Sequence, residues 1–245
     1  MRLWIDTDVG TNPDDAIAIL LACHHPDVTV VGVSTVAGDE DTRAAVARRL
    51  LASQGIGDIP VVPGARLDPR DVATVAPDAL LAIGPLTTVA RLVPHEVWPE
   101  RVAVMGGIRG RVRHRGAWRE TETNFASNPA AAALVVDALD PVIVPLDVTA
   151  AVVLTDDERA RLDAHVPPLQ ESLEGWADPV CIHDPVALLT LVDEPFTTVG
   201  RQPLRVDERG RLRDDGAAAE RRVVVAVDRD TAIARMFHLL VGEHR

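Results

Sequence analysis

Short apolar runs alternate along the chain with longer segments in which apolar residues recur at helical spacing. The runs are rich in Val, Ile and Leu and are bounded by Gly, Pro, Asn or Asp. Such runs are typical of buried strands, and the segments between them are typical of helices packed on one face. Strands that alternate with helices favour a parallel sheet with helices on both faces. We therefore predict an α/β fold with an open, doubly wound, mostly parallel sheet.

The pattern places these elements along a single domain that spans residues 1–245. An apolar run from Leu3 begins the sheet, and further strands are predicted at residues 28–36, 59–62, 79–83, 102–105 and 142–146. Helices are predicted at 13–24, 41–53 and 86–93, from Asn128-Pro129 onward, and at 184–192 and 230–241. A small C-terminal β-meander is predicted at 197–206, 211–213 and 222–227. Residues 63–78 and the arginine-rich, mobile segment 108–121 are predicted to be loops, and 150–180 to be mostly helical and irregular.

Composition excludes several classes of function. The formal charge of −12 argues against nucleic acid and anionic membranes as partners. No apolar run is long enough to span a membrane, and the first strand begins without a signal peptide. Cys23 and Cys181 follow no disulfide or metal spacing, so we expect ordinary thiols in a reducing, cytoplasmic compartment. The chain has no lysine, which excludes a Schiff-base lysine and a P-loop ATPase.

Four aspartates, Asp6, Asp8, Asp14 and Asp15, stand at the end of the first strand and the start of the first helix. The Asn-Pro pair before Asp14 suits the N-cap and the first helical position, so Asp14 and Asp15 fall in the first turn. Asp8 follows the strand, at the edge where open α/β sheets bind ligands. Converging carboxylates repel one another unless a cation joins them, and their hard oxygens suit Ca²⁺ or Mg²⁺. A solvated acidic turn that caps the helix is the alternative interpretation.

Residues 6–16, Asp-Thr-Asp-Val-Gly-Thr-Asn-Pro-Asp-Asp-Ala, resemble the N-terminal signature of the nucleoside N-ribohydrolases of the inosine-uridine preferring type. The resemblance implies the α/β fold of that family and a bound Ca²⁺. It also implies hydrolysis of the N-glycosidic bond of ribonucleosides, which gives ribose and the free base. The expected partner is a small ribonucleoside, and a homo-oligomer is left open.

Two later turns resemble the calcium-binding segments of the family. In Ile83-Gly84-Pro85-Leu86-Thr87, the resemblance makes the Ile83 carbonyl a ligand. In Cys181-Ile182-His183-Asp184-Pro185, it makes Asp184 a ligand and places His183 near the nucleobase. A plain strand-to-helix turn and an N-cap pair are the structural alternatives. The metal ligands that the resemblance implies are Asp8, Asp15, Ile83 and Asp184.

Two other segments resemble those that hold the sugar. Met105-Gly106-Gly107 implies that Met105 packs near the ribose, and Glu122-Thr123-Asn124 implies that Glu122 and Asn124 hold its hydroxyls. Asp39, at a strand end, stands where many members have Asn and is also predicted to bind substrate. Without the resemblance, Met105 would be assigned to the core, and Glu122 and Asn124 to an exposed polar loop.

The chain also departs from the family. It is shorter, and the gaps fall between Asp39 and Ile83 and between Asp147 and His183. Thr88 replaces an Asn, no counterpart of the Asn that helps to bind the 5′-hydroxyl occurs near Gly116, and tyrosine is absent from the sequence. The resemblance therefore covers the metal and the ribose diol more fully than the base pocket and the 5′ end.

The expected mechanism uses a cation to lower the pKa of a water molecule and a neighbouring carboxylate to take the proton. Asp14 is the predicted base, because it is adjacent to Asp15 but is not needed as a ligand. Asp6 is expected to orient the ligands without binding the cation itself. Cleavage passes through an oxocarbenium-like state, and His183, which can titrate near neutral pH, is predicted to assist departure of the base.

Two other functions compete with this hypothesis. A HAD-type phosphatase would also carry Asp6-Thr7-Asp8, but its chemistry normally needs a lysine, and it does not explain His183-Asp184-Pro185. A catalytically weakened ribose- or nucleoside-binding protein of the same fold would suit the shortened regions. We favour the hydrolase, and the sequence leaves the nucleobase, the pathway and the oligomeric state open.

Overall fold

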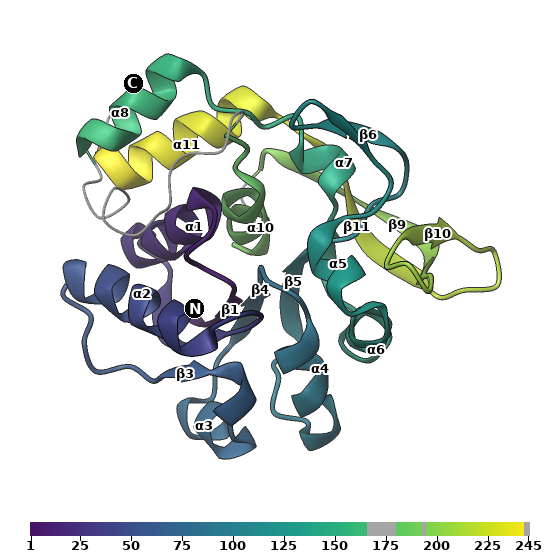
Figure 1. Ribbon diagram of the computed structural model, residues 1–245, viewed down its shortest axis with the longest axis horizontal. Coiled ribbons are helices and arrows are strands. Elements are labelled where there is room, and N and C mark those ends of the chain that lie inside the picture. The colour runs from purple at the N-terminus through teal and green to yellow at the C-terminus, as the bar shows by residue number, and fades with distance from the viewer. Residues whose placement is uncertain (166–179, 193–194, 243–245) are drawn as a thin grey trace.

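A nine-stranded sheet forms the centre of the computed structural model, which describes residues 1–165, 180–192 and 195–242 (Figure 1). In spatial order, its strands are β10 (Leu212–Asp214), β9 (Thr197–Val206), β11 (Glu220–Val227), β8 (Val142–Val144), β5 (Arg101–Met105), β4 (Ala79–Ala82), β1 (Arg2–Thr7), β2 (Thr29–Thr35) and β3 (Val61–Pro63). Neighbouring strands from β3 to β11 are parallel, and β9 and β10 extend the sheet in antiparallel pairs. The predicted fold class, with its C-terminal meander, is confirmed.

The order of the strands reverses at β1. This strand pairs with β2 on one side and with β4 on the other, so the chain completes one half of the sheet before it builds the other. The register aligns Asp6 of β1 with Ser34 of β2 and with Ala82 of β4. In open α/β sheets, ligands bind beyond the carboxyl ends of the strands at such a point. The fold therefore favours a site beside the segments that follow β1 and β4.

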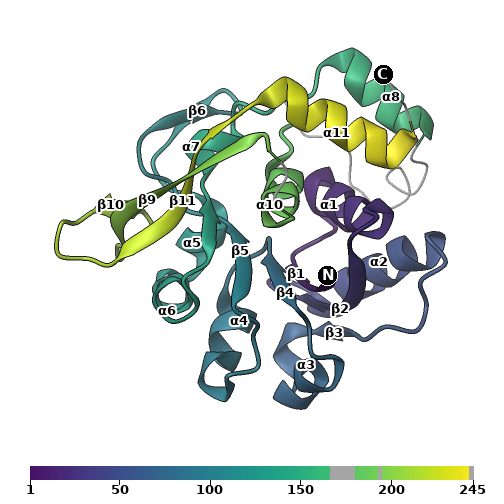
Figure 2. The ribbon, with the colours of Figure 1, turned by 180° about the vertical axis from the view of Figure 1, so that it is seen from behind.

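Two apolar cores lie on opposite faces of the sheet, because successive strand residues point to opposite sides. In β1, Leu3 and Ile5 belong to one core and Trp4 belongs to the other. The described helices that contribute to the first core are α1 (Pro13–His24), α2 (Glu40–Ser53), α7 (Leu146–Thr149), α8 (Asp156–His165), α10 (His183–Leu191) and α11 (Arg229–Val241). Those of the second core are α3 (Pro69–Val75), α4 (Thr87–Leu92), α5 (Thr123–Ser127) and α6 (Pro129–Leu139). Figures 1 and 2 show the two layers from both sides.

Helix α10 is buried along its whole length, and α1 is buried from Pro13 to Ala22. Both helices are apolar on all sides after their first turns, as expected for helices enclosed by other elements. Helix α1 packs against α10, and α11 packs against both. Acidic residues in the first turns of α1 and α10 are therefore held in fixed, buried positions. Among the described residues, none of the helices is both long and apolar enough to cross a membrane.

The prediction of a loop over residues 63–78 is wrong. The segment contains a 3₁₀ turn, η1 (Gly64–Arg66), and the helix α3. The Asp68 carboxylate accepts the backbone N–H of Arg70, and the Asp71 carboxylate accepts the N–H of Asp68 at 2.9 Å. This reciprocal capping box, followed by Pro69 at the first helical position, was present in the sequence. The segment has too few apolar positions for a helical period to reveal it.

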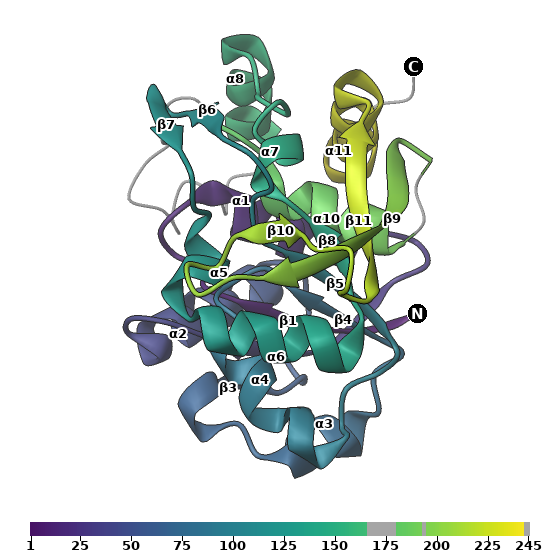
Figure 3. The same cartoon turned by 90° about the vertical axis from the view of Figure 1, so that its right-hand side faces the viewer.

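The arginine-rich segment 108–121 is also more ordered than predicted. It forms a hairpin of β6 (Val112–His114) and β7 (Ala117–Arg119). Arg115 and Gly116 join the strands with φ values of 49° and 73°. Two successive positive φ values match the twist of the hairpin, as in a type I′ turn. Figure 3 shows this hairpin on the side of the sheet that carries α1 and α10, opposite α4 and α6.

Candidate active site

A cleft of about 450 Å³ opens beyond the carboxyl ends of β1 and β4. Of the ten residues predicted from the sequence, it is lined by nine: Asp8, Asp14, Asp15, Ile83, Met105, Glu122, Asn124, His183 and Asp184. The structure therefore brings together side chains from five separate segments of the chain. Asp39 is the predicted residue that does not line the cleft.

The first turn of α1 positions Asp14 and Asp15. Asn12 occupies the N-cap position and Pro13 begins the helix, as predicted, but the Asn12 side chain does not cap the helix. Its Oδ1 instead accepts a hydrogen bond from Arg115 Nη2 at 3.3 Å, which ties the β6–β7 hairpin to the start of α1. Thr7 Oγ1, at the end of β1, donates to Asp15 Oδ1 at 2.5 Å and fixes that carboxylate.

Three buried carboxylates, those of Asp14, Asp15 and Asp184, offer oxygen atoms that all lie within 4.8 Å of one another. Burial, together with the charges of the neighbouring acids, raises the pKa of all three above the ordinary value. The largest charge effects on the Asp184 carboxyl come from acidic groups. Hard oxygen donors that repel one another fit a divalent cation such as Ca²⁺. We refer to these three residues as the acidic cluster.

Asp8 lies in the same cleft but is less enclosed than the acidic cluster, because 26% of its side chain is exposed. Its Oδ2 lies 3.9 Å from Arg43 Nη2. Burial raises the pKa of Asp8, and the Arg43 guanidinium opposes the shift. Arg43 is held by the carbonyls of Val9 and Ala37. The sequence predicted Asp8 as a ligand and Asp14 as the base, and the structure groups Asp14 with Asp15 and Asp184. These two roles stay predictions.

One wall of the cleft is formed by Glu122 and Asn124 at the start of α5 (Thr123–Ser127). The Glu122 carboxylate accepts the backbone N–H groups of Gly107, Asn124 and Phe125 at 2.8, 2.6 and 3.0 Å. Burial raises the pKa of Glu122 to about 7, although these three N–H groups oppose the shift. A Cβ on Gly106 would lie 2.3 Å from the Phe125 ring, so glycine is required for this close approach.

Asn124 connects this wall to the sheet. Its Nδ2 donates to the backbone carbonyls of Ile83 at 2.9 Å and Met105 at 3.1 Å. The Ile83 carbonyl, predicted as a metal ligand, therefore already accepts one hydrogen bond and keeps a second lone pair. Asn124 and Met105 both line the cleft, as the resemblance implied. Because its amide nitrogen is held by backbone carbonyls, Asn124 has its Oδ1 left to accept a hydroxyl.

His183, the first residue of α10, is buried at another wall of the cleft. Its Nδ1 lies 2.7 Å from the hydroxyl of Thr149, in α7 (Leu146–Thr149), and its ring centroid lies 5.1 Å from that of His114. Burial lowers the pKa of His183 to about 3, with smaller contributions from His114 and Arg115. Such surroundings favour the neutral imidazole, so His183 does not keep the near-neutral pKa that the sequence analysis expected, and its role in departure of the base stays a prediction.

Asp39 and Asp6 lie outside the acidic cluster and are hydrogen-bonded to neighbouring residues of the protein. Asp39 is exposed at the N-cap of α2, where its carboxylate accepts the backbone N–H of Thr42 at 3.1 Å and the Thr42 hydroxyl at 2.8 Å. Asp6 is buried behind the cleft, and its Oδ1 accepts the hydroxyl of Ser34 at 2.5 Å. Ser34 also accepts the indole N–H of Trp4. Burial raises the pKa of Asp6 to about 8.

Sequence reasoning missed His114, Arg115 and Arg119, which also line the cleft. All three lie on the β6–β7 hairpin, which was predicted to be a mobile loop. The signal that could have found them is the glycine at position 116 between two short alternating runs. Arginine at the first turn position, instead of Asn or Asp, weakens that signal.

The chain resembles known proteins in sequence and in structure. Residues 3–78 and 72–234 match the family of inosine-uridine preferring nucleoside hydrolases. The non-specific ribonucleoside hydrolase RihC of Escherichia coli O1:K1 is 31% identical over 210 residues. That match covers 66% of this chain and 66% of the relative, so the chain spans just under two thirds of the relative's length.

Solved structures show the same fold at lower sequence identity. A plant nucleoside hydrolase superimposes with a TM-score of 0.81 at 21% identity, over 99% of both chains. An inosine-uridine preferring nucleoside hydrolase from Bacillus anthracis superimposes with a TM-score of 0.79 at 18% identity, again over 99% of both chains. With the sequence match over most of its length, the chain belongs to the inosine-uridine preferring nucleoside hydrolase family.

Proposed function

We propose that this protein is an enzyme that hydrolyses the N-glycosidic bond of ribonucleosides and releases ribose and the free base. The observation that carries this proposal is the acidic cluster, which is buried in the cleft beside β1, where the strand order of the sheet reverses. The chain also belongs to the family of nucleoside hydrolases. A sugar with two adjacent hydroxyls is a suitable partner for a cation held at the bottom of such a cleft. The HAD-type alternative is no longer needed, since the family accounts for the aspartates.

The residues that would hold the cation are Asp14, Asp15 and Asp184, with the Ile83 carbonyl as a further oxygen donor. We propose Ca²⁺, because hard carboxylate and carbonyl oxygens are its preferred ligands. A bound Ca²⁺ would supply coordination for the ribose diol and would increase the acidity of a water molecule. Thr7 holds Asp15 in place for this role through its hydroxyl.

We assign removal of the water proton to Asp8, which exchanges the roles that the sequence analysis gave to Asp8 and Asp14. Asp8 is the more accessible of the two, and Arg43 favours its ionised form. A general base must combine access to water with a carboxylate that is available to accept a proton. Calcium binding separates the assignments, because Asp8→Asn should keep calcium affinity while Asp14→Asn should lose it.

The remaining residues act on the sugar and the leaving base. Asn124 Oδ1 and the Glu122 carboxylate, both fixed by backbone hydrogen bonds, are proposed to bind the ribose hydroxyls and Met105 to pack beside the sugar. Charge develops on the sugar ring as the base departs, and the carboxylates around the ring favour that charge. His183, as a neutral imidazole whose Nδ1 faces Thr149, is proposed to position the base by accepting a hydrogen bond at Nε2, without donating a proton to it.

The test is a panel of ribonucleosides, assayed for release of reducing sugar with and without Ca²⁺. We expect turnover that requires Ca²⁺ and that is far slower for 2′-deoxyribonucleosides, because a polar site loses heavily when a partner hydroxyl is missing. No sugar release from any ribonucleoside would refute the enzyme. Thermal stabilisation by ribose without turnover would instead identify the catalytically weakened binding protein of the same fold.

We further propose that residues 1–245 form one domain, because both apolar cores use the same central strands. Cys23 and Cys181 are free thiols, which supports a reducing, cytoplasmic location. Limited proteolysis that gives one protected fragment would support the single domain, and two independently stable fragments would contradict it.

A further inference from the structure

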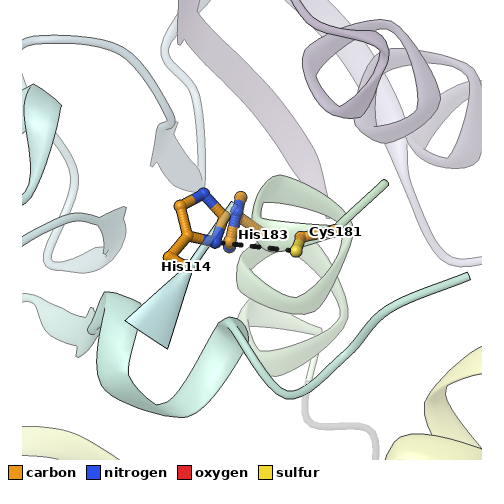
Figure 4. A group of neighbouring side chains, drawn as sticks. All are labelled: His114, Cys181 and His183. Carbon is orange, nitrogen blue, oxygen red and sulfur yellow. Dashed lines mark hydrogen bonds between the residues drawn. The ribbon is translucent and has the colours of Figure 1, made fainter. Parts of the chain in front are cut away.

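A second group of side chains that could hold a metal ion differs in chemistry from the acidic cluster (Figure 4). Two of its members, His114 and His183, line the cleft. His114, Cys181 and His183 offer ligand atoms that all lie within 4.8 Å of one another. His114 Nδ1 lies 3.8 Å from Cys181 Sγ. Tetrahedral zinc with its usual bond lengths would separate ligand atoms by about 3.5 Å, so a small closing movement would bring the three atoms into range.

Two separate segments of the backbone hold the three side chains. Cys181 is paired with Val153 in an antiparallel bridge, and His183 begins the buried helix α10. His114 ends β6, directly before the tight turn of the hairpin. Cys181 and His183 are thus fixed on one side, and the hairpin presents His114 from the other.

Thr149 prepares His183 for ligation. Its hydroxyl lies 2.7 Å from His183 Nδ1 and 3.4 Å from the carbonyl oxygen of Pro145. When Nδ1–H donates to the Thr149 hydroxyl and that hydroxyl donates to Pro145, the free lone pair of His183 is on Nε2. Histidine ligands are commonly oriented in this way by a hydrogen bond at the other ring nitrogen.

We propose that His114, Cys181 and His183 bind one zinc-like divalent cation, with its fourth coordination position open to the cleft. Imidazole and thiolate donors favour Zn²⁺, whereas the carboxylates of the acidic cluster favour Ca²⁺, so the two sites select different metals. The Cys181 thiol loses its proton to solvent as the sulfur–metal bond forms, and the local charge rises by one. Burial raises the pKa of the Cys181 thiol to about 11, so the sulfur–metal bond must outweigh this cost of losing the proton. Arg115 opposes the added positive charge and Asp14 favours it, since both act on the Cys181 sulfur.

Occupation of this site should inhibit the enzyme. The metal would engage Nε2 of His183, the group that we propose to contact the departing base, and would draw the hairpin toward α10. This consequence depends on the proposed function, whereas metal binding itself does not. Inhibition by zinc should persist at saturating Ca²⁺, because the zinc ligands differ from the calcium ligands.

The experiment uses the full chain, stripped of metal by a chelator and kept reduced, with Co²⁺ as the spectroscopic probe and Zn²⁺ in calorimetry. We expect one equivalent of Co²⁺ to produce a thiolate-to-cobalt charge-transfer band, which Zn²⁺ abolishes by displacement. Cys181→Ser should remove the band and weaken zinc binding by at least ~100-fold, as expected for the loss of a ligand. Cys23→Ser is the matched control and should behave as the unaltered chain, because Cys23 and Cys181 are the two cysteines of the sequence.

His114→Gln is the second variant, and it protects the test if Cys181→Ser fails to fold. His114 is half-buried on the hairpin, so its replacement leaves both apolar cores intact. It should also weaken zinc binding, while calcium affinity stays unchanged in both variants. A thiolate band that persists in both variants, no band in the unaltered chain, or zinc that Ca²⁺ displaces competitively would each overturn the proposal.

The kinetic measurement separates this proposal from the proposed function. If the chain hydrolyses ribonucleosides, zinc should inhibit the unaltered chain and Cys23→Ser, and Cys181→Ser should resist inhibition. If the chain hydrolyses no nucleoside, the proposed function fails, and the cobalt band and zinc affinity still decide the metal site. Inhibition of Cys181→Ser at the same zinc concentration as the unaltered chain would refute the inhibitory role.

Discussion

Buried aspartates occur in two regions of this molecule, and their pKa values are shifted in opposite directions. Asp207, between β9 and β10, accepts the backbone N–H groups of Arg209 and Arg211, both at 2.9 Å. It also lies 2.7 Å from Arg211 Nε and 3.1 Å from Arg213 Nε. Burial alone would raise the pKa of Asp207, but these partners outweigh it and hold the pKa well below the ordinary value.

The acidic cluster has the opposite balance. Burial raises the pKa values of Asp14, Asp15 and Asp184, and the neighbouring acids raise them further. Asp207 is a carboxylate that its own chain compensates, so it stabilises the meander. In the cluster, Thr7 and Arg43 act on Asp15 and Arg115 acts on Asp14, but they do not outweigh burial and the neighbouring acids. Such raised pKa values are common where carboxylates hold a ligand. The contrast distinguishes a carboxylate that its own partners keep ionised from carboxylates that we propose to bind a cation.

Among the variants that test this contrast, Asp184→Asn is expected to have the largest effect on activity. This change removes one charge from the cluster and should lower kcat/KM by ~10³-fold or more, or ~4 kcal/mol of transition-state stabilisation. The metal-free protein should keep or gain stability, because the neighbouring carboxylates repel Asp184. Steady-state kinetics and thermal melting in chelator would measure both. A metal-free variant that is markedly less stable than the unaltered chain would break the contrast.

Asp207→Asn should have the reverse profile. It removes a buried charge from two arginines and should cost roughly 2–4 kcal/mol of unfolding free energy, while kcat and KM stay within about two-fold. Denaturant unfolding monitored by circular dichroism would give the free energy. The control is Asp215→Asn on the same meander, since its pair with Arg205 is exposed and is expected to contribute little.

The pH dependence of the Asp207 contribution follows from the direction of its shift. A carboxyl whose folded pKa is depressed contributes stability that is present above the unfolded pKa, ~3.9, and is lost as the pH falls toward the folded pKa. The difference in stability between the unaltered chain and Asp207→Asn should therefore be full at pH 6 and shrink as the pH falls below about 4. A difference that grows as the pH falls would contradict the assignment.

Local motifs predicted most of the fold and much of the candidate site. Asp15 and Asp184 could be placed because each lies in the first turn of a helix whose start its own neighbours define. His114 could not be placed, because a hairpin of weak sequence signal brings it to Cys181 across 67 residues of sequence. The roles of Asp8 and Asp14 also depended on three-dimensional detail. Asp8 is partly exposed and lies near Arg43, whereas Asp14 is buried, and residue spacing near the first strand does not reveal this difference.

Calcium itself should distinguish the two regions. At 100 times its dissociation constant, a ligand that binds only the folded state adds ~2.7 kcal/mol of stability. Ca²⁺ should therefore raise the melting temperature of the unaltered chain and of Asp207→Asn by similar amounts. It should have little effect on Asp14→Asn or Asp184→Asn. Equal calcium-induced shifts in all four proteins would place the cation outside the acidic cluster.

The smallest expected effect concerns Asp39, which the sequence assigned to the substrate and the structure places at the N-cap of α2. The backbone N–H and hydroxyl of Thr42 hold the pKa of Asp39 below its ordinary value, which is typical of a helix-capping carboxylate. If capping is its main role, Asp39→Ala should lower the melting temperature by ~1–4 °C and leave KM unchanged. Asp39→Asn should preserve both, because Asn is an equally good N-cap.

The melting temperatures and KM values of these two variants, taken together, separate capping from substrate binding. A capping role predicts that stability tracks the ability of the side chain to accept the Thr42 N–H, with KM constant throughout. A substrate role predicts that KM rises in Asp39→Ala, whatever the melting temperature does. Thermal melting beside ribonucleoside KM values would decide between them. A raised KM in Asp39→Ala at unchanged stability would show that Asp39 contributes to substrate binding, although it does not line the cleft.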